Sequence, residues 1–435
     1  MLKPLCVLFL GAASLATALP PSQVVFGPAS EAPSPHDSFD FQNAVAAALA
    51  KYSDPVEAMI SLNIESKAQL YEPRLLHVLG EDKPTWLTEG DKLRLRKEGK
   101  KFIDITEHED YYAGQVNALA GKANLPDLVH ESLVRPLFSK VDTQRLRDVL
   151  THLTSYYNRY YGYVFGSKAL NGSTIISQKY IIAKSPFRTH ISLEYFTHPF
   201  PQSSIIARFE PKVRNASAPL TIIGAHQDSA NYLFPLLPAP GADDDGSGTV
   251  SILEAFRILA ESGYTPKDGP VEFHWYAAEE GGLLGSQRIA RYKKDQGAKI
   301  GAMMEFDMTG YVARNATETI GFIATQADDA LTNWVLNLAK KYIAIPAKVY
   351  ELGPSAGSDY MSYTLLNYPA AFASEGNPLA NKGFPGEYDP YIHGSHDIID
   401  IDDEKGYFSF DHMARFTELA LAFVVEQAGW DNKWR

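Results

Sequence analysis

The sequence predicts an α/β protein with three layers, α/β/α, in which helices cover both faces of a central mixed, mostly parallel β-sheet. From about residue 146 onwards, segments with strand and helix character alternate along the chain, and this order is typical of a largely parallel sheet. Several acidic residues and histidines also come directly after predicted strands. Open α/β sheets build their functional sites at the carboxyl ends of strands, so the second observation agrees with the first.

The predicted elements follow one another in a regular order. Residues 174–182, 189–196 and 203–209 have strand character, with Pro and Ser between them. The β-branched run LTIIGAHQD predicts a buried strand that ends near Gly224, and the helical spacing of apolar residues in GSGTVSILEAFRILAES predicts a helix. After these we expect the strand VEFHWYAA, the helix GLLGSQRIARYKKD, the strands IGAMMEF and TIGFIAT, the helix DDALTNWVLNLAKKY and a closing helix in DHMARFTELALAFVVEQ.

The N-terminus has the features of a secretory signal peptide. Residues 1–18 contain a lysine near the start, an apolar run too short to span a bilayer, and small residues up to Ala18. Cleavage after Ala18 would remove Cys6, the only cysteine of the chain, so the mature protein would have neither a thiol nor a disulfide. We therefore expect a secreted, extracellular protein that depends on its core and on bound metal for stability.

Residues 19–88 are predicted to be a removable pro-segment, and residues 89–435 to form the catalytic domain. A leader rich in Pro, Ser and Ala is followed by FDFQNAVAAALAKYSDPVEAMISL, which has helical apolar spacing. A permanent N-terminal subdomain is the alternative interpretation of this region. The dense charges between Lys92 and Lys101 are typical of a helical face that is exposed to solvent.

Composition and charge exclude several classes of partner. The chain has 435 residues and a formal net charge of -12, which opposes binding to nucleic acids or to anionic membranes. No stretch after the N-terminal region approaches the roughly 20 apolar residues that a membrane-spanning helix needs. We expect a monomer without a membrane anchor. The sequons at Asn171, Asn215 and Asn315 are candidate N-glycosylation sites of a secreted chain.

The candidate chemistry lies in acids and histidines that follow predicted strands. His226 and Asp228 follow one strand, Glu279 and Glu280 follow another, and Asp307 follows a third. Neighbouring side chains at a strand end point in opposite directions, so one of two adjacent glutamates can bind a metal while the other faces a water. This pair therefore suggests a division into a metal ligand and a general base.

A loop of three aspartates precedes a predicted helix in Pro-Gly-Ala-Asp-Asp-Asp-Gly-Ser-Gly, residues 240–248. Adjacent carboxylates repel one another, and a helix dipole offsets only part of that repulsion, whereas a dication offsets much more. A surface loop or a helix cap is the alternative. With His393 in YIHGSHD, two histidines and three carboxylates suit zinc, and a shared carboxylate suits two ions. His274 and His396 are expected to be structural.

These motifs resemble the zinc aminopeptidases of peptidase family M28, and most closely their secreted fungal leucine-aminopeptidase-like branch. The matching motifs are GAHQDS, PGADDDGSG, YAAEEGGLLGS, EFDMTGY and YIHGSHD, in family order across roughly residues 203–400. The resemblance implies a zinc-exopeptidase fold of the phosphorylase/hydrolase-like type. The segment WLTEGDKLRLRKEGKKFIDIT also resembles the end of the pro-region in that branch, which implies a precursor whose pro-segment acts as an inhibitor or assists folding.

The resemblance also implies a role for each site residue. It assigns His226 and Glu280 to one zinc, Asp307 and His393 to the other, and a bridging position to Asp244, for a total of two Zn²⁺. Glu279 would be the general base, Asp228 would orient His226, and the peptide bond between Asp244 and Asp245 would be cis. Met308 and Ile392 match positions of the substrate pocket.

The sequence departs from the family pattern in one place. Some relatives have a disulfide and a tyrosine just before a Ser-Asp pair, whereas this chain reads Gly-Pro-Ser-Ala-Gly-Ser-Asp at residues 353–359. The group that contacts the oxyanion and the shape of the specificity pocket are therefore open at this point.

The expected reaction is removal of N-terminal residues, with a preference for leucine-like side chains, from peptides and proteins that have a free N-terminus. The metals would activate a water, and Glu279 would accept its proton and pass it to the leaving amine. Three alternatives use the same fold: a glutaminyl cyclase with one zinc, a carboxypeptidase or dipeptidase with two, and a binding domain that has lost catalysis.

Overall fold

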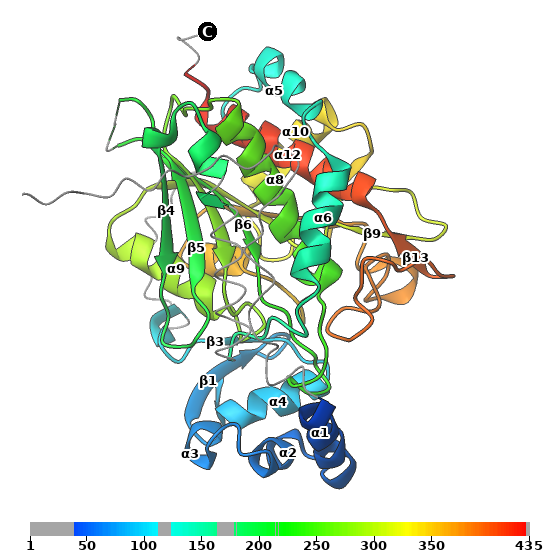
Figure 1. Ribbon diagram of the computed structural model, residues 1–435. Coiled ribbons are helices and arrows are strands. Elements are labelled where there is room, and N and C mark those ends of the chain that lie inside the picture. The colour runs from blue at the N-terminus through cyan, green and yellow to red at the C-terminus, as the bar shows by residue number, and fades with distance from the viewer. Residues whose placement is uncertain are drawn as a thin grey trace, which may run out of the picture.

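The computed structural model describes residues 39–111, 123–162 and 178–431, apart from residues 180, 214 and 216. The predicted signal peptide, the leader and the sequon at Asn171 lie outside these residues. The ribbon divides into a large α/β part and a smaller N-terminal unit that packs against one end of it (Figure 1). Among the described residues, no helix is both long enough and apolar enough to cross a bilayer.

An eight-stranded mixed sheet forms the middle layer of the large part, as predicted. Its four central strands, β12, β8, β6 and β7, are mutually parallel, whereas β10, β5 and β4 each pair antiparallel with a neighbour. In spatial order the strands are β11 (Ala347–Tyr350), β10 (Ile320–Ile323), β12 (Ala370–Glu375), β8 (Ile300–Phe306), β6 (Leu220–His226), β7 (Val271–Tyr276), β5 (Ser204–Phe209) and β4 (Ile191–Phe196).

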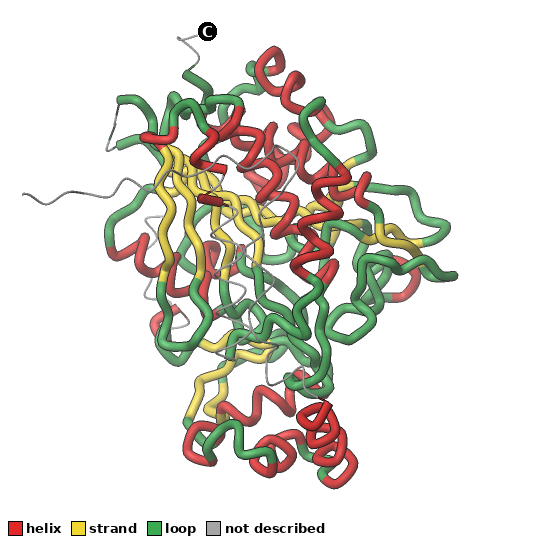
Figure 2. Tube along the Cα trace, in the orientation of Figure 1, coloured by secondary structure: helices red, strands yellow, loops and turns green. Residues whose placement is uncertain are grey.

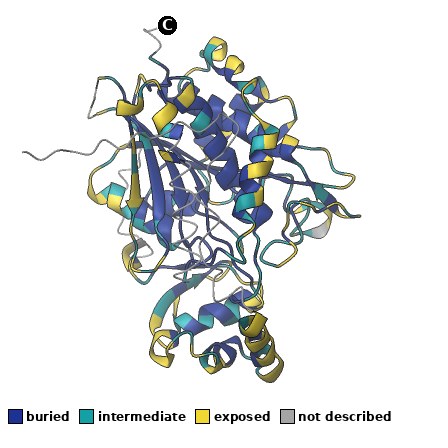
Figure 3. Cartoon of the chain, in the orientation of Figure 1, coloured by how far each residue is buried: buried dark blue, intermediate teal, exposed yellow. Residues whose placement is uncertain are grey.

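Helices cover both faces of this sheet, which confirms the predicted three layers (Figure 2). One core cluster joins the sheet to α5 (Glu131–Phe138), α6 (Thr143–Leu153), α8 (Gly248–Glu261), α10 (Asp329–Tyr342) and α12 (Phe410–Ala428). A second cluster joins the opposite face to α9 (Leu284–Asp295) and α11 (Tyr360–Thr364). Helix α12 is buried along nearly its whole length, in agreement with its run of apolar residues (Figure 3).

The N-terminal unit consists of residues 39–111. Its three-stranded antiparallel sheet has the order β2 (Thr85–Thr88), β1 (Pro73–Val78) and β3 (Phe102–Asp104). The helices are α1 (Phe39–Lys51), α2 (Pro55–Ser61), α3 (Lys67–Leu70) and α4 (Glu89–Lys97), followed by a short turn at Glu109–Tyr111. They share a core cluster with side chains of the large part, among them those of Tyr160, Phe234 and Ala278.

Two sequence expectations concern this region. The boundary predicted between residues 88 and 89 lies inside the unit, where Thr88 ends β2 and caps α4 by accepting a hydrogen bond from the Asp91 N–H, and processing at that point stays a prediction. The charged residues of α4 do form a helix, but the helix is not solvent-facing throughout. Lys92 is 1% exposed and Arg96 is 2% exposed, because both point into the interior of the molecule.

Most of the remaining sequence expectations agree with the structure. Strand β6 extends to His226, two residues beyond the expected end at Gly224. Residues 178–182 were expected in a strand, but the described residues between 178 and 184 are helical. The sequence did not predict β11, β12 or α11, nor the small antiparallel sheet formed by β9 (Tyr311–Ala313) and β13 (Gly406–Phe408).

Strand β7 shows how both sheet faces are stabilised. Apolar side chains on one face, including Trp275, pack in the cluster beneath α8 and α12. On the opposite face the buried Glu272 accepts hydrogen bonds from Arg208 at 2.6 Å and Lys293 at 2.7 Å, and its second oxygen lies 2.7 Å from His274 Nε2. Burial by itself raises the pKa of Glu272, but the His274 contact and the charges of Lys293 and Arg208 lower that pKa below its usual value.

We expect Glu272→Ala to lower the free energy of unfolding by roughly 3–5 kcal/mol, because removal of one partner leaves buried charges without compensation. The pKa of Glu272 is lower in the folded state than its usual value of 4.5, so its stabilisation is present above pH 4.5 and is lost as pH falls below it. Urea unfolding at pH 7 and at lower pH measures the free energy of unfolding of the wild type and of the variant. The difference in unfolding free energy between wild type and Glu272→Ala should shrink in acid, and an unchanged difference would contradict this account.

Candidate metal centre

Three neighbouring strands bring the predicted site residues to one edge of the sheet. Strand β6 lies between β8 and β7, and it ends at His226. Asp307 follows β8 directly, and the Glu279–Glu280 pair lies in the loop after β7. Asp244 comes from the turn at Ala242–Ser247 that leads into α8, and His393 from the long loop before β13. The parallel direction of the strands thus gathers residues that are far apart in the sequence.

The five predicted ligands form two groups that share Asp244. His226, Asp244 and Asp307 make one group, and Asp244, Glu280 and His393 make the other. One oxygen of Asp244, Oδ1, lies 3.1 Å from His226 Nε2, and the other, Oδ2, lies 2.8 Å from His393 Nε2. This carboxylate therefore faces a different imidazole with each oxygen, as the bridging ligand of two ions would.

The partners differ from the sequence expectation, which paired His226 with Glu280 and Asp307 with His393. His226 Nε2 instead lies 3.7 Å from Asp307 Oδ1, and His393 Nε2 lies 3.7 Å from Glu280 Oε1. Asp307 comes immediately after β8, so it stays beside the end of β6, whereas Glu280 lies four residues beyond the end of β7 and reaches the His393 loop. The residues are those expected, but the two histidines exchange partners.

The donor atoms of these groups fit metal ions. Nε2 of both histidines and Oδ1 of Asp307 are buried, and they have no hydrogen-bond partner among the described residues. Buried polar atoms are rarely left without a partner, and here the orphaned atoms face one another. Burial opposes ionisation of Asp244, but the two histidine charges hold its pKa well below the usual range. Imidazole nitrogens and carboxylate oxygens together suit zinc.

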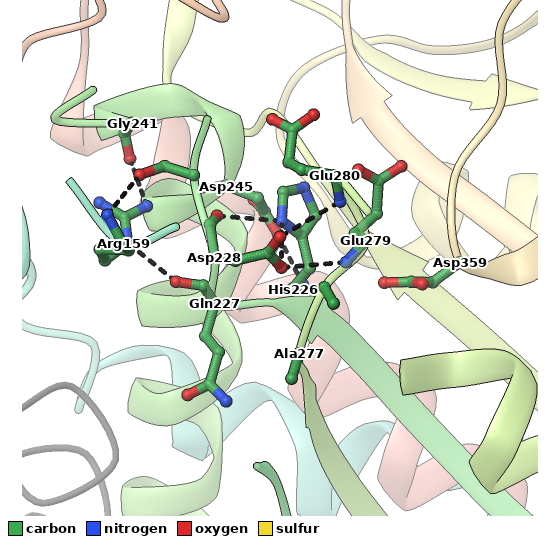
Figure 4. A network of polar contacts seen from close by, with 12 residues as sticks. Arg159, His226, Gln227, Asp228, Gly241, Asp245, Ala277, Glu279, Glu280 and Asp359 are labelled. Carbon is green, nitrogen blue, oxygen red and sulfur yellow. Dashed lines mark hydrogen bonds and ion pairs between the residues drawn. The ribbon is translucent and has the colours of Figure 1, made fainter. Parts of the chain in front are cut away.

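Asp228 connects the histidine to the glutamate pair (Figure 4). Its carboxylate accepts hydrogen bonds from the Glu279 N–H at 3.0 Å and from the Glu280 N–H at 3.2 Å. His226 Nδ1 lies 3.2 Å from the backbone oxygen of Asp228 and 3.6 Å from Oδ1 of its side chain. The imidazole is thus held mainly by the backbone of Asp228, while the carboxylate fixes the loop that carries Glu279 and Glu280.

Glu279 lies beside both groups without belonging to either. Its Oε2 is buried and has no hydrogen-bond partner among the described residues. Burial raises the pKa of Glu279 well above its usual value, and the neighbouring Lys101 only partly opposes this effect. A buried carboxyl group with a raised pKa, next to a metal centre, has the properties of a general acid or base.

The side chains of the other two aspartates of the acidic loop accept hydrogen bonds from backbone N–H groups. Asp245 accepts hydrogen bonds from the His226 N–H at 3.1 Å and from the Gly248 N–H at 2.8 Å, so it fixes the end of β6 to the start of α8. Asp243 accepts from the Gly310 N–H at 2.7 Å. The side chain of Asp397 in turn accepts from the backbone N–H of Asp243 and Asp244. The peptide bond between Asp244 and Asp245 is cis, as the resemblance implied.

Arg159 fixes the two loops that carry His226 and Asp244 (Figure 4). Its buried guanidinium donates to the backbone oxygens of Gln227 at 2.8 Å and Gly241 at 2.8 Å, and it also contacts the backbone oxygen of Pro240. Burial lowers the pKa of Arg159, although acidic side chains nearby favour its charged form. The two loops are therefore joined by a cation that contacts only their carbonyl groups.

The structure places the remaining predicted residues as follows. Met308 is buried with a φ of 59°, and Ile392 packs at the margin of the same core cluster. In the region that lacks the family tyrosine, Ser358 donates to Asp307 Oδ2 at 2.7 Å. The side chains of Asn215 and Asn315 are exposed. His274 is buried against Glu272 and His396 is exposed, so neither joins the metal groups.

A segment of the N-terminal unit covers the glutamate side of the site. Lys101 Nζ lies 3.7 Å from Glu279 Oε2 and 3.8 Å from Glu280 Oε2, and Arg96 donates to the backbone oxygen of Glu280. Burial alone lowers the pKa of Lys101, but Glu279 and other nearby acids raise that pKa well above its usual value. The cavity that remains between Lys101, Phe102, Tyr232 and the two glutamates has a volume of about 10 Å³.

Sequence reasoning missed several residues that shape the site, namely Lys101, Arg159, Tyr232, Ser358 and Asp397. Lys101 and Asp397 were visible as charges, and Ser358 was named as part of an altered motif. A single arginine or tyrosine outside a motif gives no such signal, because its role depends on loops that meet only in the folded chain.

The chain is similar to several known proteins. A family model described as Peptidase family M28 matches residues 204–417. Leucine aminopeptidase 1 of Chaetomium globosum is 38% identical over 358 residues, covering 80% of this chain and 83% of that protein. Leucine aminopeptidase 1 of Phaeosphaeria nodorum is 36% identical over 394 residues, covering 88% and 96%. The crystal structure of the Legionella pneumophila LapA aminopeptidase is similar with a TM-score of 0.67 at 29% identity, covering 83% of this chain and 95% of that one.

Proposed function

Because this chain belongs to peptidase family M28 and is a metallo-aminopeptidase, we propose that it removes N-terminal residues from peptides with two zinc ions per chain. The observation that carries this proposal is Asp244, whose two oxygens face two different imidazoles. The five ligands would be His226 and Asp307 at one position, His393 and Glu280 at the other, and Asp244 between them.

The chain's own residues account for the movement of the proton. Bound zinc would supply the Lewis acidity that activates a water and polarises the scissile carbonyl. Glu279 accepts the proton of the attacking water, because its buried carboxylate lies beside both ligand groups without belonging to either. It then delivers this proton to the leaving amine. Asp228 keeps Glu279 in place through the hydrogen bond to its backbone N–H.

The proposed substrate preference follows from the relatives. Several similar proteins are named leucine aminopeptidase 1, so we propose leucine-like apolar side chains at the substrate's N-terminus. A carboxypeptidase would use the same fold and the same ligands, so the assays described below decide between cleavage at the two ends of a peptide.

We further propose that the protein is secreted as a monomeric precursor whose N-terminal unit inhibits it. The cavity beside Glu279 has a volume of about 10 Å³, room for about one water, and Lys101 and Phe102 are among its lining residues. We infer that these residues must move before a peptide can occupy this side of the site. Because the N-terminal unit is described up to residue 111, we propose that processing occurs within residues 112–122 and not at residue 88. Asn215 and Asn315 remain candidate glycosylation sites of such a secreted chain.

We expect the processed protein to contain about two zinc ions per chain and to hydrolyse leucine p-nitroanilide. A chelator of divalent metal ions should abolish this hydrolysis, and added zinc should restore it. Metal analysis and three assays decide between the alternatives: aminoacyl-nitroanilide cleavage, C-terminal trimming and pyroglutamate formation. Full metal content with pyroglutamate formation or C-terminal trimming, and no nitroanilide cleavage, would overturn the aminopeptidase proposal. Full metal content with no turnover in any assay would indicate an inactive binding domain.

A further inference from the structure

Tyr232 contacts both side chains that complete the Glu280 and His393 group. Its hydroxyl donates to Glu280 Oε2 at 2.9 Å, and its ring stacks on the imidazole of His393 with centroids 3.7 Å apart and planes 3° from parallel. Its backbone N–H donates to the His393 oxygen at 3.0 Å. One residue thus holds a carboxylate, an imidazole ring and the backbone of a loop.

His393 needs such support because of its backbone conformation. Its φ is 57°, in the left-handed region that residues other than glycine rarely adopt. The loop of His393 is long and irregular, and the residue lies several positions before β13. The parallel ring and the hydrogen bond from Tyr232 therefore fix an imidazole that no helix or strand holds.

Tyr232 also determines which oxygen of Glu280 faces the metal position. Oε2 accepts the phenol, while Oε1 lies 3.7 Å from His393 Nε2. The same division exists at the other position, where Asp307 Oδ2 accepts from Ser358 and Asp307 Oδ1 lies 3.7 Å from His226 Nε2. The two carboxylates that are not shared between the groups, those of Glu280 and Asp307, thus each have one oxygen that accepts from a hydroxyl group and one that is left for a metal.

We propose that Tyr232 is a positioning residue that sets the zinc affinity of the Glu280 and His393 position alone. This inference rests on the two-metal site proposed above. Hydrogen-bond partners of metal ligands fix the geometry of those ligands, and their removal typically weakens metal binding by about 10–100-fold. Tyr232 acts through Glu280 and His393, and it contacts neither residue that is specific to the other position, His226 or Asp307.

Zinc titration against a competing chelator, on the full chain, measures the two dissociation constants separately. We expect Tyr232→Phe to raise the dissociation constant of the Glu280 and His393 position by about 10-fold or more. Tyr232→Leu, which also removes the stacked ring, should raise this constant further. Ser358→Ala should raise the dissociation constant of the His226 and Asp307 position, because Ser358 donates to Asp307. The control Tyr264→Phe removes a phenol whose hydroxyl lies 3.4 Å from the Val424 oxygen on α12, and it should change neither constant.

Two additional measurements separate positioning from a general loss of structure. The metal-free Tyr232→Phe protein should still be folded, with a far-UV circular dichroism spectrum like that of the metal-free wild type. His393→Ala removes a ligand of the Glu280 and His393 position. In that background, Tyr232→Phe should not change the dissociation constant of the His226 and Asp307 position. Two unchanged constants in Tyr232→Phe, or two that rise equally, would overturn the role of Tyr232 while leaving two zinc ions per chain. A wild-type chain that binds fewer than two ions would overturn this proposal and the proposed function together.

Discussion

Glu279→Gln should lower kcat of the processed enzyme by about 10²–10⁴-fold while the protein keeps its zinc. This is the contribution typical of a positioned general base. The amide is nearly the same size as the carboxylate but accepts no proton at neutral pH. Because Glu279 belongs to neither ligand group, the metal content should remain near two ions per chain. Steady-state hydrolysis of leucine p-nitroanilide and metal analysis on the same samples measure both quantities.

A matched control makes the same chemical change away from the site. Glu261 ends α8, is exposed and pairs with Arg257 at 2.8 Å, so Glu261→Gln should keep kcat and zinc unchanged. If Glu279→Gln lost zinc together with activity, Glu279 would act as a ligand and not as the base. If the variant kept its zinc and more than a tenth of wild-type kcat, another group would have to accept the proton.

The architecture of the large part was predictable where the hydrophobic pattern was continuous. Strands β6, β7 and β8 are fully buried runs, and α8 and α12 have apolar residues at helical spacing, so their sequences indicate them directly. Strand β12 was missed because its sequence, AAFASE, is rich in small residues of low strand propensity. Its place between β8 and β10 is set by the neighbouring strands and not by its own residues.

The site was predictable as a set of residues but not as a geometry. The motifs indicate the candidate ligands because they contain acids and histidines at the carboxyl ends of strands and in the loops beside them. Which imidazole meets which carboxylate depends on how far each loop extends past its strand, and the sequence contains no such distance. The same limit explains why Tyr232 and Arg159 were missed, since both act through loops that lie far from them along the chain.

Helix α4 shows that a charged helical face does not always meet water. Lys92 pairs with Asp104 at 2.6 Å and Glu89 at 2.9 Å, and Arg96 donates to the carbonyl of Glu280. A run of charges looks the same in sequence whether its partner is solvent or a surface of opposite charge. The acids that pair with Lys92 belong to the same N-terminal unit, but the carbonyl that accepts from Arg96 lies 184 residues further along the chain. The position of this helix against the site is therefore information that only the folded chain provides.

Cleavage of the chain within residues 112–122 should raise hydrolysis of leucine p-nitroanilide by about 100-fold or more once the N-terminal unit has dissociated. An inhibited state that is populated to about 99% leaves about 1% of the chain competent to bind substrate, which reduces the apparent affinity by that fraction. The contacts that hold this state include Lys101 beside both glutamates and the Asp104 N–H, which donates to the Gly282 oxygen at 3.0 Å. A protease site engineered into residues 112–122 allows the same preparation to be assayed before and after cutting.

The uncut chain provides a second test of the same contact. Lys101→Met removes the partly buried ammonium that pairs with Glu279, so the covering segment should open more often and the uncut variant should be more active than the uncut wild type. Lys100→Met is the matched control, because Lys100 is exposed and its ion pair among the described residues is with Glu98 of its own unit, at 2.8 Å. An uncut wild-type chain as active as the cut one would show that peptides reach Glu279 with the unit in place. In that case residues 39–111 would be a permanent subdomain, and Lys101 would be part of the working site and not its inhibitor.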